Sequence, residues 1–352
     1  MKPNCMSWLI LTCALTAAGC GTDPGQRAGV HVEVPALPDT IVSTESGLIG
    51  GLADWAVHPD GSLFLLDARS RRVHVIDGMG QLRRTIGRPG QGPGELERPA
   101  SLFLGGASLT VVDPGNGRLQ QFTLDGDATT SEAISTCASG PAPPARGPDG
   151  TLVRPTLGFG AGLAVVCSAS GEERGRLGAL LAPGQVVVNM AELRAQAIEG
   201  EIPALLLNAA SAVVGEDGAV WLTVSAAKQV ERYDPRGDRI FLTTVEEPGF
   251  DAVLAAWIEQ NREMDDFNLA GLDYLLRARE VRGDLWILTN SGERPGARLL
   301  VLSGEGQVRE RLEFTHVTGA GNFVVDEERG RVYFYIPGTA EVLRVSFDVM
   351  AM

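Results

Sequence analysis

Long apolar runs are scarce in this sequence, and the one that stands out lies at its beginning. Lys2 precedes an apolar stretch at residues 6–18, which is shorter than a membrane-spanning helix usually is. This layout is typical of a signal peptide, and no later segment is apolar enough to cross a bilayer. We therefore expect an exported protein without an integral membrane domain.

Positive charge is also scarce. The chain of 352 residues has 30 lysine and arginine residues against 44 aspartate and glutamate residues, a formal net charge of −14 at pH 7. An overall field of this sign does not attract nucleic acid or anionic lipid headgroups. We therefore expect no nucleic-acid partner.

Histidine is nearly absent, and the four histidines do not cluster. They are His31, His58, His74 and His316, in separate parts of the chain. A zinc site needs several such ligands close together. No serine or cysteine has a recognisable nucleophile elbow or catalytic partner either. We therefore expect no metal, no cofactor and no catalytic residue.

The apolar stretch ends in the segment TAAGC at residues 16–20, which resembles the lipobox of bacterial lipoproteins. In that family the signal peptide is cut before the cysteine, and the thiol carries a lipid. The resemblance predicts a signal peptide at residues 1–19, lipidation at Cys20 and a flexible tether at 20–29. Gly21, in place of an aspartate, favours the outer membrane, on its periplasmic or surface side. An ordinary secretory signal cut nearby is the alternative.

The stretch IGRPGQGPGELERP, residues 86–99, could be a phosphate-binding glycine loop or a joint between two structural units. A dinucleotide-binding fingerprint needs a strand before it and a helix directly after it. Here Pro93 lies inside the motif, and the segment after Pro99 is typical of a strand, a turn and another strand. The stretch is therefore predicted to be a joint, whose glycines and prolines provide an irregular path.

Turn glycines recur through the chain and define a repeat. Each predicted unit contains four short strands, with one glycine turn after the first strand and another after the third. The period is near 45 residues, which is typical of propeller blades, and six units predict an all-β, six-bladed β-propeller at residues 30–352. The first glycines are Gly61, Gly106, Gly150, Gly218, Gly283 and Gly330, and the second are Gly80, Gly126, Gly171, Gly237 and Gly306.

The sixth unit ends after three strands, so the ring needs a fourth strand from elsewhere. Residues 30–43 are unassigned and begin with alternating apolar residues. We expect a strand from this N-terminal segment to complete the last blade, because closure removes exposed sheet edges.

The second unit resembles an NHL repeat. It has a glycine-rich approach, an Asp-x-x-Asn-x-Arg turn at Asp113, Asn116 and Arg118, and a closing Asp-Gly. The whole chain resembles the six-bladed propeller lipoproteins of bacteria. This resemblance implies the fold strongly and says little about the function.

Two connections between units are about 20 residues longer than the others, at residues 184–209 and 248–272. Both are predicted to emerge on the same face, and both can form short helices. In the second, Val253, Trp257 and Met264 fall at helical spacing. The helix either packs on the rim with these residues in its core, or forms a lid beside the channel mouth.

The candidate binding face combines the long connections with a set of turn residues. Arg72, Arg118 and Lys228 occupy equivalent places in three units. One interpretation is structural, an ion pair or hydrogen bond across each turn. The other is a broken basic ring suited to an anionic ligand. The complete candidate set is Arg72, Asn116, Arg118, Lys228, Trp257, Arg262 and Asp265.

Cys137 and Cys167 would form an even pair once Cys20 is lipidated, which invites a disulfide. The predicted strands, however, place them on opposite faces of neighbouring blades. A strand of about six residues spans roughly 20 Å, whereas bridged α-carbons lie within about 7 Å. We therefore expect two free, buried thiols.

The predicted innermost strands contain few groups suited to catalysis. Asp54, Glu280 and Asn322 are scattered candidates for a metal in the channel. We therefore expect a non-catalytic, lipid-anchored scaffold that binds an envelope protein, a peptide or a glycan. The alternative is a metal-dependent propeller enzyme, a gluconolactonase-like hydrolase or a lyase, with its site in the central channel.

Overall fold

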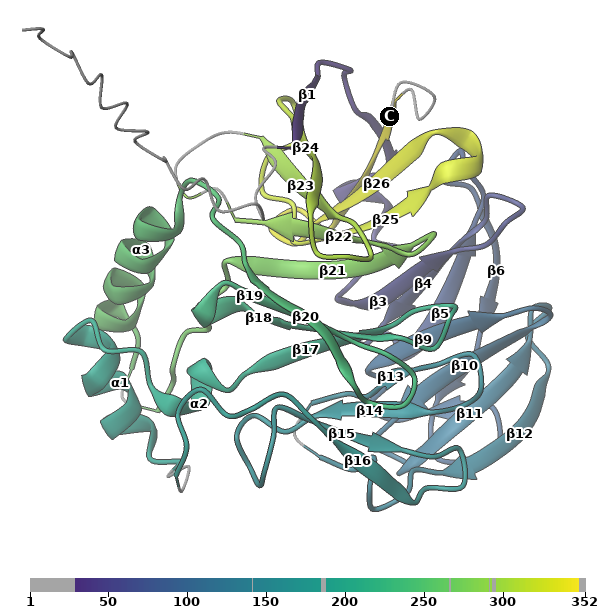
Figure 1. Ribbon diagram of the computed structural model, residues 1–352. Helices are drawn as coiled ribbons and strands as arrows, with labels where there is room; N and C mark the ends of the chain where they lie inside the picture. Colours follow the sequence, from purple (N-terminus) through teal and green to yellow (C-terminus); the bar gives the residue numbers. More distant parts are fainter. Residues whose placement is uncertain are drawn as a thin grey trace, which may run out of the picture.

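The computed structural model describes residues 29–140, 142–184, 188–265, 267–290, 292 and 296–347, so the predicted signal peptide and Cys20 lie outside it. Six sheets are arranged in a ring, each one propeller blade of four antiparallel strands, and one of them has an additional fifth strand (Figure 1). The predicted six-bladed fold, with four-stranded blades and short helices, is confirmed.

The first strand of each blade lies innermost and lines the central channel. These strands carry many small and polar residues, because their side chains share the narrow space around the axis. The third blade has the shortest one, with two residues. The inner strands are β3 (Leu52–Val57), β9 (Ser101–Gly105), β13 (Ala145–Arg146), β17 (Ala210–Val214), β21 (Leu275–Val281) and β25 (Asn322–Asp326).

The second strands are the most apolar. Neighbouring blades cover both faces of each one, so their sequences are nearly continuous apolar runs such as LFLLD and VWLTV. Their side chains fill the hydrophobic clusters between successive blades. The second strands are β4 (Leu63–Asp67), β10 (Ser108–Asp113), β14 (Leu152–Pro155), β18 (Val220–Val224), β22 (Asp284–Thr289) and β26 (Arg331–Ile336).

The third and fourth strands lead outward to solvent and become more polar. The outer strand of blade 2, with sequence ATTSEA, is exposed along its whole length. The third strands are β5 (Arg72–Ile76), β11 (Arg118–Thr123), β15 (Ala164–Cys167), β19 (Gln229–Tyr233), β23 (Ala297–Leu302) and β27 (Glu341–Ser346). The outer strands of blades 1 to 5 are β6 (Leu82–Ile86), β12 (Ala128–Ala133), β16 (Glu173–Leu177), β20 (Arg239–Thr244) and β24 (Val308–Phe314).

An N-terminal strand closes the ring, as predicted. β2 (Asp39–Val42) pairs antiparallel with β27 and is the fourth strand of blade 6. The preceding strand, β1 (Val30–Val34), pairs parallel with β24 and becomes a fifth strand of blade 5. The N-terminal segment therefore joins two neighbouring blades, of which the sequence predicted only one.

Each blade twists from its inner to its outer edge, and this twist determines which parts of neighbouring blades are in contact. The outer turn of one blade lies against the end of the outer strand of the blade before it. Gly237, in a blade 4 turn, lies beside Leu177 at the end of blade 3. Gly171, in a blade 3 turn, lies so close to Ser135 that an added methyl group would be 2.4 Å from the serine Cβ.

The expectation of free thiols at Cys137 and Cys167 is wrong, because the two residues form a disulfide with their Cα atoms 5.9 Å apart. The predicted last strand of blade 2 ended at Cys137, on the face opposite Cys167. That strand ends at Ala133, and the blade twist carries the β15–β16 turn against the segment that follows. The disulfide thus links blade 2 to blade 3.

Three helices lie in the two long connections, α1 (Met190–Ile198) and α2 (Ala204–Leu207) before blade 4 and α3 (Phe250–Glu263) before blade 5. α1 and α3 lie side by side on one face of the ring (Figure 1), where Arg194 Nε donates to the Asn261 carbonyl oxygen at 2.7 Å. We call this the helix face, and the opposite face, which holds the turns between first and second strands, the turn face. No helix in the described part of the chain is long and apolar enough to span a membrane.

Small elements complete the described chain. A two-stranded parallel ribbon, β7 (Arg88–Pro89) and β8 (Glu95–Leu96), lies in the glycine-rich joint between blades 1 and 2. The remaining elements are three 3₁₀ turns, η1 (Thr44–Ser46), η2 (Ser225–Ala227) and η3 (Glu327–Arg329).

Candidate functional site

The central channel contains a cavity of about 370 Å³. Inner strands of five blades line it, together with the segment that leads into β13. Blade 6 contributes no lining residue among those that the structure describes. Its side of the channel is closed by an ion pair between the two blades that flank it.

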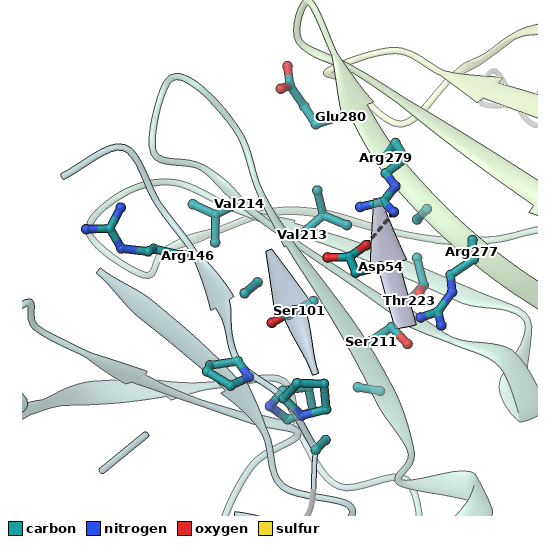
Figure 2. Close-up of a pocket in the computed structure, with 18 of the residues that line it drawn as sticks. Asp54, Ser101, Arg146, Ser211, Val213, Val214, Thr223, Arg277, Arg279 and Glu280 are labelled. Atoms are coloured by element: carbon teal, nitrogen blue, oxygen red, sulfur yellow. Dashed lines mark hydrogen bonds and ion pairs between the residues drawn. The ribbon is translucent and has the colours of Figure 1, made fainter. Parts of the chain in front are cut away.

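That ion pair joins Asp54 of blade 1 to Arg279 of blade 5. Asp54 Oδ1 lies 2.8 Å from Arg279 Nη2 (Figure 2), and Asp54 Oδ2 accepts a hydrogen bond from the Leu102 backbone at 3.1 Å. The side chains are 14% and 29% exposed, so water screens the pair only partly. Both carboxylate oxygens of Asp54 are therefore engaged.

Two further arginines line the cavity. Arg146 and Arg277 have no hydrogen-bond or ion-pair partner for their side chains within the described residues. Desolvation inside the ring, together with the nearby charge of Arg279, lowers the pKa of Arg277 below its usual value. With Asp54 and Glu280 as the two carboxylates, the lining carries a formal charge of +1, in a chain of net charge −14.

Hydrogen-bond donors outnumber acceptors in the cavity. Arg279 Nε, Arg146 Nε and Ser101 Oγ are buried without a partner in the described structure. Ser211 and Thr223 stand directly opposite each other on β17 and β18 and add two hydroxyl groups. Buried polar groups are nearly always satisfied in proteins, by water or by a ligand where the protein offers nothing. The cavity is therefore suited to a ligand rich in hydrogen-bond acceptors.

The mouth on the turn face is acidic. A second cavity of about 370 Å³ opens there and shares Arg279 and Glu280 with the first. Desolvation and the neighbouring Glu216 and Asp217 raise the pKa of Glu280, whose carboxylate accepts a hydrogen bond from the Gly283 backbone. The carboxylates around this mouth are Glu216, Glu280, Asp326, Glu327 and Glu328, against the two arginines Arg279 and Arg282. Anions are repelled from this side.

The helix face also has a hollow, beneath α3. A groove of about 530 Å³ runs between this helix and the chain entering β21. Its helix side consists mainly of small residues such as Ala252 and Ala256, and its floor includes Leu276, which also lines the central cavity. The groove and the cavity therefore have Leu276 as a common lining residue.

Asn116 and Arg118 have a structural role in the glycine-rich joint. Arg118 Nη2 donates to the carbonyl oxygens of Gly92 and Glu95, at 2.7 Å each. Asn116 Nδ2 donates to the Gly90 carbonyl oxygen at 3.0 Å. These contacts hold the irregular path from blade 1 to blade 2, and neither residue lines the cavity.

Arg72 and Lys228 also lie away from the channel. Arg72 is exposed, and the carboxylate of Asp67 opposite it accepts instead from backbone N–H groups, including that of Gly51 at 2.9 Å. Lys228 Nζ lies 3.3 Å from a carboxylate oxygen of Glu246. The predicted broken basic ring is therefore not assembled around the channel, because these residues belong to turns farther out in the blades.

Trp257, Arg262 and Asp265 stabilise the second long connection. Trp257 is 2% exposed in a hydrophobic cluster, and its Nε1 donates to the Ala270 carbonyl oxygen at 2.8 Å. Arg262 pairs with Glu259 at 2.9 Å, and Asp265 accepts hydrogen bonds within its own turn. The buried side of this helix therefore packs on the rim of the propeller, which was one of the two interpretations of the sequence. Its alanine side borders the groove.

The scattered candidates for a metal site remain apart. Asp54 pairs with Arg279, Glu280 lies toward the turn face, and Asn322 does not line the cavity. Among the described residues, no group of three or more histidine, cysteine, aspartate or glutamate side chains is arranged to hold a metal ion.

Sequence reasoning missed the arginines of the channel. Carboxylates and histidines are the groups expected in a catalytic channel, but the inner strand β21 instead has Arg277 and Arg279 two residues apart. Residues at this spacing project to the same side of a strand. This pair was the signal that could have located the cavity.

The fold and the cavity define a six-bladed propeller with a polar channel site. A family described as "6-bladed beta-propeller" matches residues 41–140, and no curated protein matches the sequence. A Bacteroides fragilis protein described as exported is similar, with a TM-score of 0.53 at 10% identity, over 90% of this chain and 98% of that one.

Two other solved structures have comparable similarity. A luciferin-regenerating enzyme has a TM-score of 0.50 at 12% identity, over 88% of this chain and 95% of that chain. Regucalcin, a calcium-binding protein from Agrobacterium tumefaciens, has a TM-score of 0.49 at 9% identity, over 90% and 95%. Identities this low assign no function to this chain.

Proposed function

We propose that this protein is a non-catalytic binding propeller of the bacterial cell envelope, and that a peptide, a glycan or part of an envelope protein binds in its central cavity. The observation that carries this proposal is the set of unpartnered donors from several blades. Ligand sites are typically concave and contain a few convergent polar groups, and the cavity has both properties.

The envelope location is part of the proposal. Residues 1–19 have the layout of a signal peptide, and Cys20 stands where a lipidated cysteine would follow. The similarity to a protein described as exported supports this location. A lipid on Cys20 would hold the propeller at a membrane without a spanning helix.

The alternative, a metal-dependent channel enzyme, has less support. A catalytic metal needs protein ligands that converge on one point, with an open position left for water or substrate. Asp54 instead uses both oxygens within the protein, and Glu280 accepts a backbone hydrogen bond. The cavity therefore offers an excess of donors where a cation would need acceptors.

Thermal melting of the body at residues 21–352 separates these alternatives. We expect the same melting temperature with calcium, with zinc and with a chelator. A drop of several degrees in chelator, restored by one metal, would favour the enzyme and contradict the binding propeller.

A channel-blocking variant tests the binding function directly. Ser211→Trp would fill the cavity, whereas Thr130→Trp places the same side chain on the exposed outer strand of blade 2. Each protein is incubated with a low-mass extract of cell envelopes, and its retained components are identified by native mass spectrometry. We expect retention by the wild type and by Thr130→Trp, and loss in Ser211→Trp. The same components on all three would contradict binding in the channel.

A further inference from the structure

We propose that the cavity recognises one carboxylate group of a small organic ligand, and that the Arg277 guanidinium is its anchor. This inference rests on the proposed binding function and specifies its ligand. Arg277 is the arginine best placed for this role because it lines the cavity, is unpartnered among the described residues and lies next to additional donors.

The surroundings of Arg277 form a donor cluster. Figure 2 shows its guanidinium on the same side of the cavity as Ser211 and Thr223, while Glu280 points to the opposite end. Ser211 and Thr223 are paired in the register of β17 and β18, so their hydroxyl groups belong to one small area. A carboxylate there would accept a forked pair of hydrogen bonds from Arg277 and further ones from the hydroxyls.

The carboxylates of the protein leave this position open. Asp54 is held by Arg279 and by the Leu102 backbone. Asp273 borders the groove beneath α3 and attracts Arg277, yet it makes no ion pair with it. A ligand carboxylate would therefore complete a charge pair that no described side chain of the protein completes.

The charge of the lining matches one negative charge. Its formal value of +1 would be neutralised by a monocarboxylate, whereas a phosphate dianion would leave an uncompensated charge. Because the turn-face mouth is acidic, the ligand would enter from the helix face.

The rest of the lining indicates a ligand with small side groups. The volume of about 370 Å³ falls at the low end of the range for small-molecule sites, roughly 300–1,000 Å³. Small apolar residues surround the polar cluster, namely Ala53, Ala100, Ala210, Ala212 and Ala278.

Calorimetric titration with three probes tests the assignment. The probes are N-acetyl-alanyl-alanine with a free carboxylate, the same dipeptide as its C-terminal amide, and inorganic phosphate. They are titrated into the wild type, Arg277→Gln and Arg98→Gln. Arg98 is exposed, lies outside the cavity and has no side-chain partner among the described residues, so its variant is the matched control.

We expect the wild type and Arg98→Gln to bind the acid at least about tenfold more tightly than the amide, since charged hydrogen bonds are lost with the amide. Arg277→Gln should weaken acid binding by a similar factor, with an unchanged circular dichroism spectrum. Equal binding of acid and amide, tighter binding of phosphate, unchanged binding in Arg277→Gln, or no binding of either dipeptide would overturn the assignment.

The channel-blocking experiment separates failure of this inference from failure of the proposed function. If Ser211→Trp loses envelope components that Arg277→Gln retains, binding in the channel stands and the carboxylate assignment is wrong. If the wild type and Ser211→Trp retain the same components, the binding function itself is wrong.

Discussion

At the scale of single residues, arginines in equivalent repeat positions have different roles. Arg118 holds the glycine-rich joint through two carbonyl oxygens, whereas Arg72, at the same place in blade 1, is exposed and has no side-chain partner among the described residues. The pair therefore offers a matched test of what these hydrogen bonds contribute to stability.

We expect Arg118→Ala to lower the free energy of unfolding by about 1.5–3 kcal/mol, because charged hydrogen bonds to the loop carbonyl groups are lost. Arg72→Ala should change it by less than about 0.5 kcal/mol, as surface substitutions usually do. Urea unfolding of both variants measures these values. Equal losses in the two variants would contradict the structural role of Arg118.

The free energy of unfolding should also depend on pH through the buried imidazole of His74. His74 is 8% exposed, and burial lowers the pKa of its imidazole below the usual 6.5 despite the nearby Asp67. The unfolded chain therefore binds a proton near pH 6.5, while the folded chain does so only at lower pH. Stability is lost as the pH falls through about 6.5 toward the folded pKa.

His74→Gln removes this contribution. The measurement is the free energy of unfolding in urea at pH 7.5 and at pH 5.5, for the wild type and for the variant. The decrease on acidification should be smaller in the variant. Equal decreases would show that other groups account for the pH dependence.

The structural character of Asn116 and Arg118 follows from the repeat motif, but their partners do not. The sequence predicted that Arg118 pairs across its own turn, whereas its side chain reaches back to the joint more than 20 residues earlier. Asn116 contacts both places, since its Nδ2 donates to Asp113 Oδ2 at 2.6 Å and to the Gly90 carbonyl oxygen. Arg277 was overlooked for a similar reason, since its importance depends on which side chains surround it in space.

At the scale of elements, the N-terminal segment tests how the ring is held closed. Removing residues up to 43 deletes β1 and β2, which leaves blade 6 with three strands and an exposed β27 edge. We expect this truncation to lower the melting temperature by more than about 10 °C or to prevent folding, because deletion of the closing strand affects the whole ring.

Removing residues only up to 36 is the control, because it deletes β1 and leaves β2 in place. This shorter truncation should melt within a few degrees of the full body. Differential scanning calorimetry measures both truncations. An unchanged melting curve after the longer truncation would show that β2 does not close the ring.

Closure by the N-terminal segment could be predicted because the last unit lacked a strand. The parallel pairing of β1 with blade 5 could not, since alternating apolar residues predict a strand without naming its partner. The alternation at residues 30–34 belongs to β1, and the closing strand lies nearer residue 40.

At the scale of the whole molecule, the disulfide links two blades where the ring has its shortest inner strand. Cys137→Ser and Cys167→Ser should each lower the free energy of unfolding by about 2–4 kcal/mol, the usual contribution of a disulfide. Thiol counting on the denatured body, residues 21–352, should find no free thiol without reductant. Two free thiols would contradict the linkage.

The disulfide also shows where reasoning from the sequence ends. Turn glycines and the period of the repeat predict the number of blades and the order of their strands. They carry no information on how far each blade rotates from its inner to its outer edge. The contact between Ser135 and Gly171 is a product of that rotation and depends on the complete ring.

The position of β1 determines where a membrane anchor would attach to the ring. β1 is the outermost strand of blade 5, so the chain enters the fold at the circumference and not beside the axis. A lipid on Cys20 would therefore attach to the propeller by the rim of blade 5. Both mouths of the channel would then lie away from the point of attachment and remain open to the aqueous space.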